Sequence, residues 1–269
     1  MRSHTYKPAH PRCCHAAPHR TLNGSLVICV HASLVKAWLA ARESYAGVVP
    51  LDASRARRFY DRMGRWQDTQ RFYEDAATAR LTQAASFAEA SSVFELGCGT
   101  GRFAAGLLAG ELPGDARYLG VDVSPEMVRL GRLRLAAWAP RAEVRLLEPP
   151  ALTVLGADAS VDRFVATYVF DLLSDSDARA LIDEAHRVLV PDGLLALVSL
   201  THGTTTASRL VSGAWGAIAT RWPGLVGGCR PIELGDLIKP GGWEIVERDV
   251  VISWGVPSEV LVATRHRGS

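Results

Sequence analysis

A glycine-rich loop is the most chemically informative feature of this 269-residue chain. Gly97, Gly99 and Gly101 follow an apolar run at Val93–Leu96 and precede a segment of helical character that begins at Arg102. Glycines in such a loop permit positive φ and allow a ligand to approach the backbone without meeting a Cβ. The amide groups of the loop and of the first helical turn would then face the ligand. The loop therefore predicts a small-molecule site between a strand and a helix.

A carboxylate follows at a spacing that suits this site. Asp122 closes the next apolar run, Tyr118–Val123, and lies 25 positions after Gly97. In a βαβ unit this spacing places the carboxylate at the carboxyl edge of the neighbouring strand, where it can accept hydrogen bonds from both hydroxyls of a ribose. The alternative role is a helix cap, but Ser124 can cap the following helix without help. The sequence thus favours a ligand that contains ribose.

The elements that position these residues alternate along the chain, with apolar runs that predict strands and amphipathic segments that predict helices. The expected fold class is α/β: a Rossmann-like, doubly wound sheet, mostly parallel, with helices on both faces. An antiparallel C-terminal hairpin is expected at one edge, around the turn Gly255-Val256-Pro257. The predicted strands are 93–96, 118–123, 144–147, 164–169, 194–200, 243–254 and 259–264; the predicted helices include 102–109, 125–138, a segment capped by Ser174 that stops at Pro191, and one through Leu210.

Two ligand classes compete for the glycine loop. A dinucleotide fingerprint needs a third glycine five positions after the first, and Arg102 occupies that position. The spacing here is Gly-x-Gly-x-Gly, with Glu95 two residues before Gly97. In this combination the sequence resembles the class I S-adenosylmethionine-dependent methyltransferases, in particular the small-molecule group that includes the ubiquinone and menaquinone methyltransferases. The resemblance runs from about Ser54 to Thr264.

The resemblance implies roles at the cofactor site. Residues 95–101, which include Glu95 and Cys98, match the motif that cradles the methionine part of the cofactor. Asp122 matches the acidic residue that binds the ribose, and Val123 matches the position beside the adenine.

The resemblance also covers the later strands and the N-terminal side. Tyr168 matches the end of the fourth strand, near the sulfonium, and residues 187–193 match the turn into the fifth strand. Tyr60 belongs to a segment similar to the helical cap over the cofactor, which is expected at about residues 52–85. One departure concerns the adenine. The family usually has Asp-Ala after the third strand, whereas this chain has Pro150-Ala151, with Glu148 as a possible substitute.

Candidate catalytic residues lie on the predicted loops at the carboxyl edge of the sheet. Methyl transfer from a sulfonium is an in-line displacement with a neutral leaving group, so the protein mainly aligns the reactants and excludes water. No metal is required. A general base helps only when the nucleophile carries a proton, and the candidates are Tyr168, Asp171 and His202. A structural role is the alternative for His202. Tyr60 and Tyr73 could line the pocket or belong to the core.

Residues 1–45 differ in composition from the rest. They are basic, and no acidic residue precedes Glu43. A targeting peptide fits that composition, a metal site is conceivable but matches no zinc spacing, and a poorly ordered extension is the favoured reading. The methyltransferase domain is expected to occupy residues 46–269. Its net negative charge gives no electrostatic case for nucleic acid.

The remaining observations concern location and substrate. Five unpatterned cysteines favour a reducing cytoplasm, and no apolar run is long enough to span a membrane. We therefore predict a cytoplasmic enzyme that methylates a small molecule, such as a quinone, lipid or aromatic acceptor. Trp215, Trp222 and Trp254 could form an apolar pocket or simple core. The alternatives are a non-catalytic cofactor-binding protein of the same fold and a nicotinamide-dependent oxidoreductase, which Arg102 disfavours.

Overall fold

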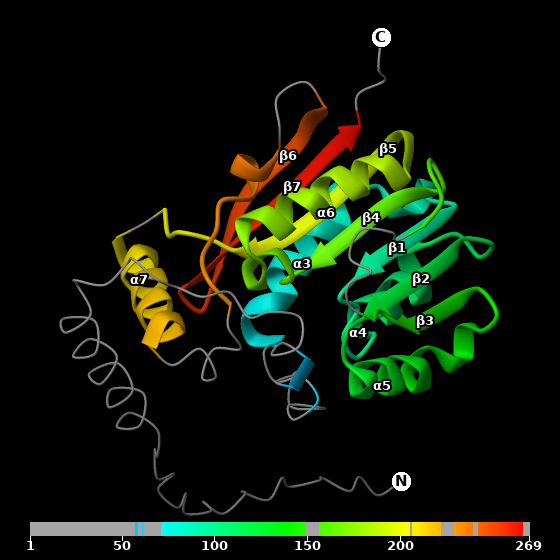
Figure 1. Cartoon of the computed structure of the whole chain (residues 1–269), viewed down its shortest axis with the longest axis horizontal. Helices are drawn as coiled ribbons and strands as arrows, with labels where there is room; N and C mark the ends of the chain where they lie inside the picture. Colours follow the sequence, from blue (N-terminus) through cyan, green and yellow to red (C-terminus); the bar gives the residue numbers. More distant parts are fainter. Residues whose placement is uncertain are drawn as a thin grey trace, which may run out of the picture.

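The computed structural model describes residues 57–58, 61, 71–148, 156–204, 206–221, 229–238 and 242–265. Within these ranges seven strands form one sheet in the order β3-β2-β1-β4-β5-β7-β6 (Figure 1). The strands are β1 (Ser92–Leu96), β2 (Arg117–Asp122), β3 (Ala142–Leu146), β4 (Val161–Thr167), β5 (Leu189–Leu200), β6 (Trp243–Ser253) and β7 (Val256–Arg265). The predicted α/β class with a doubly wound sheet is confirmed.

Helices cover both faces of this sheet (Figure 1). The α-helices are α3 (Arg71–Ala84), α4 (Arg102–Gly106), α5 (Pro125–Leu135), α6 (Asp175–Val188) and α7 (Thr206–Arg221). Side chains of α3, α4 and α5 join one buried apolar cluster, and those of α6 join another on the opposite face. Because strands β3, β2, β1, β4 and β5 pair in parallel, their carboxyl ends meet at one edge.

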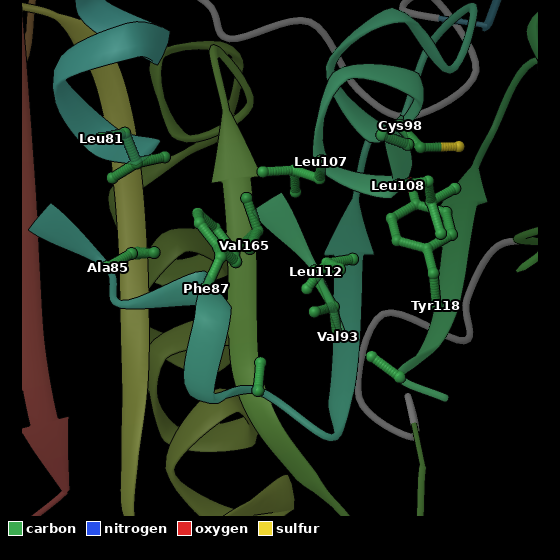
Figure 2. Close-up of a cluster of buried hydrophobic side chains, with 14 of the residues drawn as sticks. Leu81, Ala85, Phe87, Val93, Cys98, Leu107, Leu108, Leu112, Tyr118 and Val165 are labelled. Carbon is green, nitrogen blue, oxygen red and sulfur yellow. The ribbon is translucent and has the colours of Figure 1, made fainter. Parts of the chain in front are cut away.

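The core beneath the glycine loop explains why Val93, Phe94 and Leu96 of β1 are apolar. Figure 2 shows Val93 of β1 and Tyr118 of β2 beside Leu107, Leu108 and Leu112, which follow α4. On the other face the rings of Phe94 and Phe164 lie 5.2 Å apart. A central parallel strand is buried on both faces of the sheet, so apolar side chains are needed on both faces.

The C-terminal hairpin confirms the antiparallel edge but shifts the predicted turn. β7 pairs antiparallel with both β5 and β6, and it begins at Val256. The turn consists of Trp254 and Gly255, with φ of +53° and +81°. Two consecutive positive φ values suit a tight two-residue hairpin turn, which leaves Val256 and Pro257 in the strand.

Two other predicted boundaries were wrong. The helix predicted to stop at Pro191 ends at Val188, and β5 already begins at Leu189. The fixed φ of proline is compatible with extended backbone, so Pro191 belongs to the strand. The helix predicted over 102–109 keeps α-geometry to Gly106 and continues as a π-helix over Leu107–Glu111.

No helix among the described residues is both long enough and apolar enough to cross a membrane.

Candidate functional site

The glycine loop adopts the backbone that its sequence predicts. Gly97, Gly99 and Gly101 have φ of +70°, +52° and +73°. A Cβ on Gly97 would lie 2.4 Å from Cγ2 of Val169, which follows β4. A Cβ on Gly101 would lie 3.2 Å from the Cα of Gly131 in α5. The loop therefore needs glycine both for its left-handed conformation and for close contact with its neighbours.

The loop amides do not all face a ligand, which corrects one expectation. The amides of Gly97 and Cys98 donate to the carbonyl oxygen of Val121, at 2.8 and 3.0 Å. The amide of Gly101 donates to the carbonyl oxygen of Cys98 at 2.9 Å. These bonds close the turn and attach it to β2. The accessible part of the site therefore depends on backbone shape more than on a row of free amides.

Asp122 holds the loop from the adjacent strand end. Its Oδ2 accepts the amide of Gly99 at 2.9 Å, and its Oδ1 accepts the amide of Ser124 at 2.8 Å. The side chain is 8% exposed. Burial raises the pKa of Asp122 to about 6, while the amides of Ser124 and Gly99 oppose the rise. Ser124 caps α5 through its own hydroxyl, which accepts the amide of Met127, so α5 does not need Asp122 as a cap.

Glu95 lies beneath the loop rather than at its surface. Its carboxylate is 1% exposed and accepts the hydroxyl of Tyr118 at 2.6 Å. Burial raises the pKa of Glu95 to about 7, and the hydrogen bond from Tyr118 opposes that rise. Cys98 is also buried, and the charges of Glu95 and Asp122 together with burial raise its pKa. Glu95 is therefore placed to support the loop.

The predicted catalytic residues have different environments. Tyr168 has a φ of +56°, and its hydroxyl lies 2.9 Å from Oγ of Ser258. Its ring meets that of Tyr73 edge-on, with centroids 5.6 Å apart and planes at 90°. Asp171 is fully buried, and neither carboxylate oxygen has a hydrogen-bond partner of normal geometry among the described residues. His202 follows the end of β5 and is exposed. The structure thus groups Tyr168, Asp171 and Tyr73 around the end of β4.

Residues 93–193 match the family model described as a methyltransferase domain. This segment is therefore similar to methyltransferase domains. The matched segment runs from β1 to the start of β5 and contains the glycine loop, Asp122 and Asp171.

Curated relatives of the methyltransferase domain carry several names. A carboxy-S-adenosyl-L-methionine synthase of Chromohalobacter salexigens is 35% identical over 106 residues, which are 39% of this chain and 38% of that protein. A ubiquinone/menaquinone biosynthesis C-methyltransferase of Geotalea uraniireducens is 28% identical over 115 residues, 43% of this chain and 48% of its own length. This chain thus spans less than half the length of either relative.

Solved structures share the fold over more of the chain. The N-methyltransferase NodS of Bradyrhizobium japonicum, in complex with S-adenosyl-L-homocysteine, has a TM-score of 0.56 at 18% identity, over 72% of this chain and 88% of its own. The [4+2]-cyclase SpnF has a TM-score of 0.61 at 14% identity, over 83% and 100%. At these identities the likeness is one of fold.

The residues of the methyltransferase domain fit the cofactor. Gly97 lacks the Cβ that would collide with Val169, and Gly97 and Val123 are only half-buried at the carboxyl edge. Each carboxylate oxygen of Asp122 accepts one hydrogen bond from the backbone, and a carboxylate offers about four acceptor positions. It can therefore hold the loop and still accept the hydroxyls of a ribose.

Several predicted residues lie outside this assembly. Tyr60, Phe59, Met63 and Trp66 of the predicted cap fall outside the described residues, as do Pro150-Ala151, Trp222 and residues 1–45. Glu148 is exposed at the end of β3. Trp254, considered for a pocket or the core, is 82% exposed at the hairpin turn and contacts Phe72 edge-on, because the turn points it away from the sheet. It therefore belongs to neither.

Sequence reasoning missed one link between the loop and α3. Arg102, considered there only as a residue that is not glycine, donates to Glu74 at 3.1 Å and also binds Asp75. Tyr73, which immediately precedes Glu74, packs on Tyr168. Arg102 thus joins the cofactor loop to the helix that covers the end of β4. The sequence signal for this link was the position of Arg102 directly after Gly101, the glycine that opens α4.

Replacing Arg102 should loosen this link. We expect Arg102→Ala to destabilise the domain by about 1 kcal/mol, because the pair is partly buried, and to weaken S-adenosylhomocysteine binding severalfold. Arg102→Lys should recover part of both. Calorimetry and thermal unfolding measure these effects. Arg129→Ala, which removes an exposed pair with Glu126 on α5, is the matched control. Equal effects from both alanine variants would contradict the link.

Glu95 should make stability depend on pH. A carboxyl whose pKa rises from 4.5 unfolded to about 7 folded binds more protons in the folded state between those values. Its contribution to stability is therefore complete below about pH 4.5 and is lost as pH rises through about 7. Glu95→Gln keeps an acceptor for Tyr118 and should flatten the fall in melting temperature between pH 5 and 8. An unchanged slope would show that Glu95 does not titrate in this range.

Proposed function

We propose that this chain transfers a methyl group from S-adenosylmethionine to a small molecule. The observation that carries the proposal is the glycine loop with three positive φ values, tied to Asp122 at the carboxyl edge of the sheet. The family match over residues 93–193 supports it. We also propose that the methyltransferase domain occupies residues 46–269 and that it works in the cytoplasm, which suits the reduced state of Cys98 and Cys229.

The proposed cofactor residues act in two groups. Gly97, Gly99 and Gly101 shape the backbone beside the methionine part, and Asp122 binds the ribose, with Val123 beside the adenine. Beneath the loop, Glu95 and Cys98 support this backbone through the bonds to Tyr118 and Val121. Tyr60, as a cap residue over the cofactor, stays a prediction.

The chain's own contribution to the reaction is positioning and exclusion of water. S-adenosylmethionine supplies an electrophilic methyl group. Tyr73 is buried, Tyr168 is half-buried, and their rings lie perpendicular to each other at the end of β4. Burial raises the pKa of Tyr168, so its hydroxyl keeps its proton at neutral pH and acts as a hydrogen-bonding group. His202, exposed after β5, stays a prediction as a base.

The surroundings of these tyrosines favour an acceptor with apolar surface. Leu172, Leu200 and Val256 form a buried cluster with Tyr73 and Cys229, against which Tyr168 packs. Such a lining suits a quinol, a phenol or another aromatic or lipid-like molecule. No electrostatic feature of the described residues favours nucleic acid.

A two-step experiment tests the proposal. Calorimetry with S-adenosylhomocysteine measures binding, and transfer of a labelled methyl group from S-adenosylmethionine is then screened over phenols, quinols and amines. We expect binding and transfer to at least one acceptor. Binding without transfer to any class would favour a cofactor-binding protein or another reaction of this cofactor, as the name of the carboxy-S-adenosyl-L-methionine synthase illustrates.

A further inference from the structure

Asp171 is a buried carboxyl that the backbone amide of Leu200 and the thiol of Cys229 approach. It lies in the 3₁₀ helix Phe170–Leu172 that follows β4, with 0% of its surface exposed. Among the described residues, neither of its carboxylate oxygens has a hydrogen-bond partner with normal distance and angle. Burial of an ionised carboxylate without a partner is costly. Such a carboxyl is therefore expected to be protonated, to bind a ligand, or to be protonated when free and ionised when a ligand binds.

The groups that face this carboxyl come from three parts of the chain. They are Tyr73 and Glu74 of α3, Tyr168 after β4, and Cys229 and Arg230 of the segment before residue 234. The amide of Arg230 donates to the backbone carbonyl of Asp171 at 3.0 Å, which holds that segment over the 3₁₀ helix. The lining is thus mostly aromatic and neutral, with one cation and one other carboxylate.

The charges around Asp171 are largely engaged elsewhere. The guanidinium of Arg230 donates to the carbonyl of Leu173 at 2.9 Å and to Asp175 at 2.6 Å. Glu74 is bound by Arg102. Burial raises the pKa of Asp171 to about 7, and the amide of Leu200 and the charge of Arg230 oppose that rise. The carboxyl can therefore gain or lose a proton near neutral pH.

The turn that carries Asp171 meets the cofactor loop through Val169. β4 pairs with β1, with Ala166 opposite Leu96 just before the loop. Val169 then contacts the loop, since a Cβ on Gly97 would lie 2.4 Å from its Cγ2. Asp171 follows two residues later. The same short turn thus bears one side chain against the loop and the buried carboxyl of Asp171.

We propose, resting on the methyl-transfer function above, that Asp171 accepts the proton of a small-molecule acceptor whose attacking oxygen or nitrogen carries a hydrogen. The lone pair of that atom forms the bond to the methyl carbon, and the carbon–sulfur bond breaks with its electron pair passing to sulfur. The O–H or N–H bond breaks, and the proton moves to a carboxylate oxygen of Asp171. Hydroxyl-bearing aromatic molecules and amines are therefore the substrate class, and acceptors that carry no such hydrogen are excluded.

Proton release on ligand binding tests this without a known acceptor. S-adenosylmethionine and S-adenosylhomocysteine share the ribose and amino-acid parts, and the positive sulfonium belongs only to the former. Calorimetry of both ligands at pH 7, in buffers of low and high ionisation enthalpy, gives the protons released. Because half of Asp171 carries a proton near a pKa of 7, the sulfonium should release up to about 0.5 proton more than S-adenosylhomocysteine does.

Two isosteric variants identify the group responsible. Asp171→Asn should abolish the difference between the ligands and keep affinity for S-adenosylhomocysteine within about twofold. Asp175→Asn, which alters a carboxylate that also contacts Arg230, should leave the difference intact. A difference that persists in Asp171→Asn overturns the proposal. If Asp171→Asn does not fold, Glu95→Gln decides, because Glu95 also has a pKa of about 7. A difference that persists in Glu95→Gln supports the proposal, and its loss there assigns the proton to Glu95 and overturns the proposal.

The same data separate this inference from the function on which it rests. If neither ligand binds the native chain, the cofactor assignment fails. If both bind with equal proton release, the cofactor assignment stands and the role of Asp171 fails. Once an acceptor is known, Asp171→Asn should lower kcat at least tenfold with little change in the KM for S-adenosylmethionine, and it should remove the acidic limb of the pH–rate profile.

Discussion

Asp122→Ala should weaken S-adenosylhomocysteine binding by about 30-fold while the domain stays folded. The carboxylate is expected to accept hydrogen bonds from the ribose, and it already anchors the amides of Gly99 and Ser124. Each charge-assisted hydrogen bond contributes about 1.5–3 kcal/mol at most. Partial rehydration of the ribose reduces the net loss to about 2 kcal/mol, which is about 30-fold in Kd. Isothermal titration calorimetry measures the change directly.

A nearby acid provides the control for this variant. Glu126 lies four positions later on α5 and pairs with Arg129 at the surface. Glu126→Ala should leave Kd within about twofold, because an exposed pair of this kind contributes little. A folded Asp122→Ala variant with native affinity would refute the ribose assignment.

Gly97→Ala should have a still larger effect, which acts through the backbone. Alanine at a φ of +70° costs about 1–2 kcal/mol, and its Cβ would meet Val169 at 2.4 Å. Forced overpacking costs a further 1–3 kcal/mol or so. The loop must shift, and we expect about 100-fold weaker cofactor binding together with a lower melting temperature.

Two further variants resolve the two causes. Val169→Ala in the Gly97→Ala background removes the methyl group that collides and should recover the packing part but not the conformational part. Gly106→Ala, where an added Cβ meets nothing within 4 Å, should be neutral or slightly stabilising, because alanine is the better helix former. If Gly97→Ala binds the cofactor as well as Gly106→Ala does, the loop has no need of glycine.

The fold could be predicted from sequence because its signals are local and repeated. Apolar runs such as Val93–Leu96 and caps such as Ser174, which accepts the amide of Asp177, each report on a few neighbouring residues. The boundaries that failed depend on tertiary pairing. Leu189 extends β5 beyond the predicted start because it pairs with Val161 of β4, and no local pattern shows that partner.

The site could be predicted only in part for the same reason. Gly97, Gly99, Gly101 and Asp122 were identifiable because their spacing along the chain encodes one βαβ unit. The enclosure of Asp171 depends on α3 and on the segment around Arg230, which lie about 100 and 60 positions away in sequence. Long-range contacts of this kind leave no periodic trace, so sequence could offer Asp171 only as one of three candidates.

One measurement addresses the central claim most directly. We propose that the Gly97–Gly101 loop and Asp122 form an S-adenosylmethionine site and not a nicotinamide dinucleotide site. Calorimetry of the native chain should show saturable 1:1 binding of S-adenosylhomocysteine. The affinity should fall about 30-fold in Asp122→Ala. A separate titration with NADH should give no heat of binding. Saturable binding of NADH with none of S-adenosylhomocysteine would contradict the account.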